Sequence, residues 1–170
     1  SASHTSEVLL KVLLKRFYNL EPVYIPTQPR PVLKDMDAAL IIGNDAMAIS
    51  SEPVPYIYDL GDLWLRKTGF PVVFAVFAVR ESVIEKYSSQ ISSVVSSYHR
   101  SLGCLEKEKE HVVSKARTKY PDIIYDINSY FDLLEFKFKD ELKEALMFYY
   151  HLAGEMGLLK KVAKLNYFGK

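Results

Sequence analysis

Residues 58–80, YDLGDLWLRKTGFPVVFAVFAVR, decide the predicted fold. They complete a strand expected over residues 56–60 and continue into a short helix over residues 61–68 that Gly69 closes. Residues 71–80 follow, and their VVFAVFAV core is apolar throughout. Because a strand that is apolar on both faces belongs in the middle of a layered sheet, this stretch predicts an α/β fold.

The same alternation of helix and strand is expected upstream. Residues 5–18 carry a wide apolar face behind N-terminal hydroxyl groups, which predicts a helix. Residues 22–27 are short and β-branched, which favours a strand before a proline-rich loop. Residues 37–42 form a second expected strand, which runs into a tight turn at Gly43 and then into a short helix.

Downstream of Arg80 glycine becomes rare, helix formers dominate, and no further strand is expected. The composition predicts four helices, with Pro121 and Gly157 as stops. These helices cover residues 81–102, 104–119, 126–134 and 139–156. The last has an apolar stripe, and the tail LNYF is expected to pack back as an extended piece.

Composition excludes several classes of protein. With 170 residues, 49% of them apolar, the chain can bury a core and is not disordered. Its net charge of +1 gives no broad field for nucleic acid or anionic lipid, and no apolar run is long enough for a membrane span. The single cysteine, Cys104, excludes an internal disulfide framework. A cytoplasmic protein is expected.

Thr5 and Ser6 are the first candidates for ligand binding. A helix start offers backbone N–H groups and a favourable dipole, to which these hydroxyls add donors, so a carboxylate would suit this spot. The alternative is that Ser3 or Thr5 only caps the helix.

Gly43, Asn44 and Asp45 are the second candidates. They lie where a parallel strand is expected to end, and α/β sheets present ligand-binding loops at such ends. Alternatively, Asn44 and Asp45 only form the turn or cap the next helix.

Other conspicuous residues have plainer interpretations. Trp64 is expected to pack in the core, and Cys104 to be a buried or bystander thiol, because no histidine accompanies it locally. The run EKEK at residues 106–109 indicates a solvated helix face. The aromatic residues within 130–138 are expected to make core or lobe contacts. No histidine has a metal-ligand partner at helical spacing, and no metal site is expected.

Four segments, taken together, resemble the chorismate dehydratase family of the futalosine route to menaquinone. They are SASHTSEVLLKVLL, DAALIIGNDAM, residues 58–80 and FYYHLAGEMGLL. Residues 58–80 resemble the family most closely. The matching positions there are Tyr58, Asp59, Leu60, Gly61, Trp64, Thr68, Gly69, Pro71, Phe74, Ala75 and Val76.

The resemblance implies the two-lobed fold of type II periplasmic binding proteins, with the substrate between the lobes. Residues 1–76 would be an α/β segment of the second lobe, and residues 77–170 a hinge strand and the helical C-terminal part of the first lobe. Family members begin with an additional segment that opens the first lobe, so the resemblance implies a chain shortened at its N-terminus. Exposed strand edges would then favour a homodimer.

The resemblance also implies site roles. Thr5 and Ser6 match the hydroxyl pair that contacts a substrate carboxylate. Gly43, Asn44 and Asp45 match the cleft loop of the second lobe, and Phe74 is expected to form an apolar wall. The family more often has Asp where this chain has Asn44, so a base at that position is in doubt. Gly43 argues against the sister dihydroxynaphthoate synthase family, which has histidine there.

The implied reaction removes water from chorismate to give 3-[(1-carboxyvinyl)oxy]benzoate, and it needs no metal or organic cofactor. No residue is assigned as the general base. One alternative is a non-catalytic solute-binding protein of the same fold that takes a small anion. Another is an inactive, truncated remnant. Turnover of chorismate separates the enzyme from both alternatives.

Overall fold

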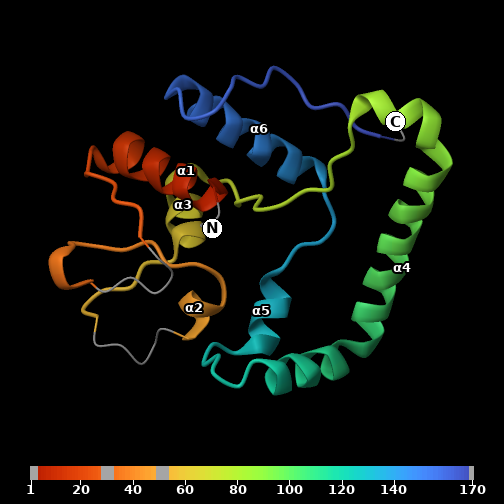
Figure 1. Cartoon of the computed structure of the whole chain (residues 1–170), viewed down its shortest axis with the longest axis horizontal. Coiled ribbons are helices and arrows are strands. Elements are labelled where there is room, and N and C mark those ends of the chain that lie inside the picture. Colours follow the sequence, from red (N-terminus) through yellow and green to blue (C-terminus); the bar gives the residue numbers. More distant parts are fainter. Residues whose placement is uncertain (1–3, 28–32, 49–53, 169–170) are drawn as a thin grey trace. The chain divides into compact units, whose positions relative to one another are not determined.

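The computed structural model describes residues 4–27, 33–48 and 54–168, and these residues are helical where they are regular (Figure 1). They divide into two compact units. Unit 1 contains Ser1–Phe74 and Phe138–Lys170, and unit 2 contains Ala75–Lys137. Whether these units correspond to the lobes expected from the sequence stays a prediction.

Unit 1 contains most of the helices. Their bounds are α1 (His4–Val12), the π-helical turn η1 (Leu13–Phe17), the short η2 (Leu33–Asp35), α2 (Gly43–Ala48), α3 (Leu60–Thr68) and α6 (Asp140–Glu155). The helix expected over residues 5–18 is confirmed as α1 with η1, and the helices expected near residues 61–68 and 139–156 are confirmed as α3 and α6.

The core of unit 1 lies where α1 packs against α3 and α6 (Figure 1). Trp64 of α3 is 1% exposed, and its ring meets three others. The ring centroids of Phe17, Phe148 and Tyr149 lie 6.2, 6.0 and 6.2 Å from that of Trp64. The prediction that Trp64 packs in the core is therefore confirmed. The buried apolar side chains around it are Val8, Leu9, Val12, Leu13, Leu146, Leu152 and Ala153.

Local capping explains why α3 begins and ends where it does. The carboxylate of Asp59 accepts a hydrogen bond from the backbone N–H of Asp62 at 2.8 Å. At the other end, Gly69 adopts φ 75°, and its N–H donates to the carbonyl of Leu65 at 2.8 Å. Glycine adopts this left-handed conformation at little cost, so it stops the helix cleanly.

Unit 2 consists of α4 (Glu81–Lys119), α5 (Ile127–Leu133) and the chain around them. Helix α4 departs from helical geometry at Tyr87 and Glu108, and Figure 1 shows that it bends. The predicted break between residues 102 and 104 is wrong, because Gly103 lies inside the helix, where glycine costs only about 1 kcal/mol. Asp126 caps α5, and its side chain accepts from the N–H of Ser129 at 2.9 Å, as expected of a helix starting near residue 126.

The predicted strands are absent from the described residues. The segments concerned are residues 22–27, 37–42, 56–60 and 71–80, and they have no assigned strand or helix, except that Leu60 begins α3. A strand exists only when its backbone N–H and C=O groups are paired with a neighbouring strand. Here no two of these segments pair, so the α/β character expected from their composition does not appear in this structure.

The C-terminal tail packs back on unit 1, as predicted. Leu165 is half-buried against the core. The ring of Tyr167 lies 6.3 Å from that of Phe138, and the Lys143 ammonium lies 4.9 Å from its centroid. No strand is assigned to the described part of the tail.

Candidate functional site

The first turn of α1 carries Thr5 and Ser6, and α6 holds it in place. Ser6 is 7% exposed and Thr5 is half-buried. The hydroxyl of Tyr149 donates to the backbone carbonyl of Thr5 at 3.4 Å. Burial, with a smaller effect from Tyr150, raises the pKa of Tyr149 to about 12, so its phenol keeps the proton that this hydrogen bond needs.

The negative charge closest to this turn is neutralised by a lysine. The one carboxylate in the first turn is Glu7, and it pairs with Lys11 one turn further along α1. The hydrogen bond from Lys11, followed by its positive charge, lowers the pKa of Glu7. The N–H groups of a first helical turn have no partner inside the helix and favour negative charge. The structure places Thr5 and Ser6 in this first turn, and binding of a carboxylate there stays a prediction.

Gly43, Asn44 and Asp45 form the first turn of α2. Gly43 has φ 63°, a value that explains why glycine stands there. Asn44 is exposed and Asp45 is half-buried. Helix α2 packs against none of the other described helices. The structure therefore places this turn in unit 1 without direct packing on α1, and its role in the same site as Thr5 stays a prediction.

Phe74 lies beside the start of α3. Its Cζ atom is 4.0 Å from the point that a Cβ on Gly61 would occupy, next to the capping carboxylate of Asp59. The ring is 57% exposed, so one face is open. Phe74 can thus present an apolar wall, and its neighbour is α3 rather than the turn at Gly43.

Cys104 and the run at residues 106–109 also have plain interpretations from the sequence. Cys104 is exposed, which leaves the second of its two expected roles, a bystander thiol. The run 106–109 is more than a solvated face. Glu106 pairs with Lys137 at 3.4 Å, and Lys109 pairs with Asp132. These partners lie more than twenty residues away, which spacing along one helix does not reveal.

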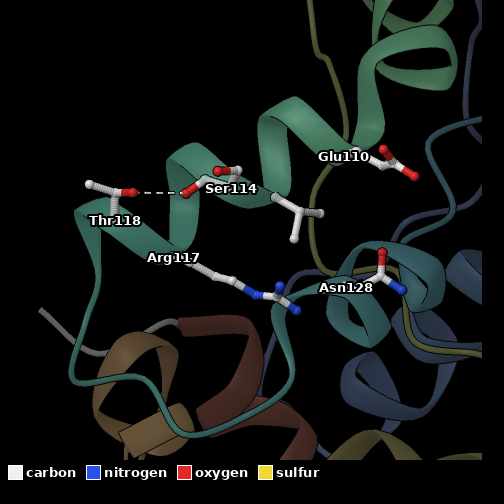
Figure 2. Close-up of a pocket in the computed structure, with 6 residues that line it drawn as sticks. Glu110, Ser114, Arg117, Thr118 and Asn128 are labelled. Carbon is white, nitrogen blue, oxygen red and sulfur yellow. Dashed lines mark hydrogen bonds between the residues drawn. The ribbon is translucent and has the colours of Figure 1, made fainter.

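A pocket of about 420 Å³ lies between α4 and α5 in unit 2 (Figure 2). Val113 is the buried residue among those lining it, and the polar lining is Glu110, Ser114, Arg117, Thr118 and Asn128. Figure 2 shows Arg117 reaching across from α4 toward Asn128 of α5. None of the predicted site residues lies here. The available sequence signal was the spacing of Glu110, Ser114 and Arg117 along one helix face.

The guanidinium of Arg117 is held by Asp126, with Nη2 to Oδ1 at 3.1 Å. The Asp126 carboxylate also accepts from the hydroxyl and the N–H of Ser129. These hydrogen bonds, the Ser129 side chain first, lower the pKa of Asp126 to about 2. The residue that caps α5 therefore also holds the guanidinium at the rim of the pocket.

Two further observations concern the described residues as a whole. No three His, Cys, Asp or Glu side chains in this part of the chain come together as metal ligands would. None of the helices described is both long enough and apolar enough to cross a bilayer.

Comparison with known proteins identifies the family. No solved structure matches this chain. A family model described as menaquinone biosynthesis matches residues 1–155, which is most of the chain and includes every candidate site residue. The match assigns a role in menaquinone biosynthesis. The chain therefore belongs to the menaquinone biosynthesis family.

Proposed function

We propose that this protein is a chorismate dehydratase, which eliminates water from chorismate to give 3-[(1-carboxyvinyl)oxy]benzoate. The observation that carries the proposal is the family match over residues 1–155. Within the family, the resemblance of residues 58–80 to the dehydratase, together with Gly43 in place of histidine, favours this reaction over dihydroxynaphthoate synthesis.

In this proposal Thr5 and Ser6 anchor a substrate carboxylate. Two features of α1 support that role: the dipole of the helix, which favours negative charge at its N-terminal end, and the two hydroxyl residues in its first turn. Tyr149 and Trp64 act as positioning residues, because Trp64 packs against Tyr149 and Tyr149 binds the Thr5 carbonyl. Because these contacts already fix the first turn of α1, binding of the substrate carboxylate does not have to include the entropic cost of ordering that turn.

Gly43, Asn44 and Asp45 supply the second set of contacts in the proposal. Glycine lets the substrate approach the backbone closely, and the Asn44 amide is exposed and able to donate or accept. The open face of Phe74 serves as the apolar wall for the ring. The proposal includes the two-lobed periplasmic-binding-protein-like architecture, which is supported by the resemblance of residues 58–80 to the dehydratase family.

The chemistry places modest demands on the protein. One ring C–H bond and one C–O bond break, the proton and hydroxide leave as water, and the ring becomes aromatic. Because aromatisation supplies much of the driving force, orientation of the ring and shielding from water are the main tasks of the site. The proton acceptor is left unassigned, since Asn44 has no basic group and the substrate's own carboxylate can serve.

The test is turnover of chorismate by the protein as its gene encodes it, with the product identified by mass and ultraviolet absorbance. Thr5→Val keeps the shape and removes one hydroxyl. We expect kcat/KM to fall by roughly tenfold to a hundredfold, as for the loss of a hydrogen bond to a charged group. Ser92→Ala, on the exposed surface of α4, is the matched control and is expected to leave kcat/KM within about twofold.

Three results would contradict the proposal. Chorismate that binds and is recovered unchanged would identify a solute-binding protein. Absence of both binding and turnover would identify an inactive protein. Equal turnover by wild type and Thr5→Val would remove Thr5 from the site even if the reaction itself were found.

A further inference from the structure

Residues 120–137, here called the strap, leave the end of α4 and run back along it. Polar contacts join the two. Arg117 pairs with Asp126 at 3.1 Å, Lys109 pairs with Asp132, and Glu106 pairs with Lys137 at 3.4 Å. In addition, the hydroxyl of Tyr98 donates to the carbonyl of Phe136 at 2.7 Å. These contacts extend from Asp126 to Lys137.

Apolar burial contributes little to this association. Within unit 2 the buried apolar side chains are Val113 of α4 and Ile127 of α5, each 5% exposed. Large apolar residues elsewhere on the strap face solvent, with Ile124 60% and Leu133 73% exposed. A segment with so few buried contacts opens at low cost, so the polar contacts decide how often the strap is closed.

The ion pairs have an uneven exposure. The Lys109 side chain is 30% exposed, whereas both members of the Glu106–Lys137 and Arg117–Asp126 pairs are more than half exposed. Exposed pairs are individually weak and are screened by salt, while a sheltered pair retains more of its attraction. Asp132 is 61% exposed, so the shelter of its pair comes from Lys109, the least exposed of the six charged side chains. Lys109 is therefore the first residue to change in a test.

We propose that the strap is an electrostatically latched segment that opens from α4 and closes on it while the core of unit 1 stays folded. The open state exposes Val113 and Ile127 and separates Asn128 from the α4 residues that line the pocket with it. The pocket therefore exists only in the closed state. Any small molecule that touches both Arg117 and Asn128 shifts the strap toward closure by mass action. This device is independent of the dehydratase proposal.

Hydrogen exchange of the whole protein, followed by mass spectrometry, tests the proposal. Raising NaCl from 0.1 to 1 M shortens the screening length from about 10 to about 3 Å. We expect amide exchange in strap peptides to accelerate roughly five- to tenfold, since three ion pairs weaken together. Peptides from α6 are the internal control and are expected to change by less than about twofold.

Charge reversal identifies the latch. Lys109→Glu is expected to accelerate strap exchange roughly tenfold at 0.1 M salt, and the added Asp132→Lys is expected to restore most of the protection. Lys107→Glu makes the same change of net charge at a lysine with no ion pair among the described residues, and is expected to leave the strap protected. Unchanged fluorescence of Trp64 reports that unit 1 is folded in each variant.

Three results would overturn the proposal. The first is strap exchange that is the same at both salt concentrations. The second is salt acceleration that is equal in strap and α6 peptides, which would mean global unfolding. The third is failure of the charge-swapped pair to recover protection.

Discussion

Replacement of Trp64 by alanine is expected to remove about 3–5 kcal/mol from the free energy of unfolding. The side chain is 1% exposed and meets Phe17 at the end of η1 and the adjacent residues Phe148 and Tyr149 of α6. Large-to-small changes at fully packed aromatic sites cost this much, because the neighbours cannot close the cavity. Each lost ring contact adds about 0.5–1.5 kcal/mol within that total.

Trp64 is the only tryptophan in the chain, so its fluorescence reports on the core of unit 1 alone. Urea unfolding of the wild type is followed by this signal and by circular dichroism, and the variant by circular dichroism. Leu65→Ala is the matched control. Leu65 is the next residue along α3 and is 48% exposed, so its replacement is expected to lower the free energy of unfolding by less than about 1 kcal/mol. Equal stability of Trp64→Ala and Leu65→Ala would refute the packing argument, as would a native emission spectrum typical of water-exposed indole.

Gly69→Ala is expected to destabilise unit 1 by about 1–2 kcal/mol in urea unfolding. A residue with a Cβ is strained at the φ of 75° that Gly69 adopts, although no described atom lies within 4 Å of the position of that Cβ. An unchanged urea midpoint would contradict this reason. The carboxyl of Asp126 is expected to titrate near pH 2 by NMR. Because the pKa is lower in the folded state, the Asp126 cap stabilises unit 2 fully at pH values above the ordinary pKa of 3.8, and this stabilisation is lost as the pH falls toward 2. A titration midpoint near pH 4 would show that the cap is not formed in solution. Cys104 is expected to react with a maleimide as fast in the native protein as in urea, because it is exposed; native protection of tenfold or more would place it in an interface or a core.

The helices could be predicted from sequence because their signals are local. Asp59 and Gly69 bracket α3, Asp126 starts α5, and an apolar stripe that includes Ala145 and Tyr149 marks α6. Each of these signals acts within four residues of its own position. The structure therefore agrees with the sequence where capping and periodicity carry the information.

The strands could not be predicted in the same way, because a strand depends on a partner that the segment itself does not encode. The VVFAVFAV run has strong β propensity, yet Phe74 and Phe77 are exposed and no ladder forms. The pocket was missed for a related reason. Asn128 and Arg117 line the same pocket because the chain turns back after Tyr120. The ion pair of Lys109 with Asp132 joins residues on either side of that turn, so the sequence shows no helical periodicity that would predict it.

The candidate site shows both limits. Thr5 and Ser6 could be proposed as candidates because a helix start has a known chemistry, and the structure adds that Tyr149 of α6 donates to the carbonyl of Thr5. The association of Thr5 with Gly43 was implied by resemblance, and α1 and α2 do not pack on each other here. Direct evidence for a shared site must come from a bound substrate.

The central claim is that the first turn of α1 binds a carboxylate of chorismate. Titration of the isotope-labelled protein with chorismate, followed by backbone amide NMR, tests it most directly. We expect the largest shifts at Thr5 and Ser6, with further shifts at Gly43 and Asn44, and for Thr5→Val we expect the titration midpoint to move to a roughly tenfold to a hundredfold higher chorismate concentration. Shifts confined to the residues around Arg117 and Asn128, or no saturable shift anywhere, would contradict the claim.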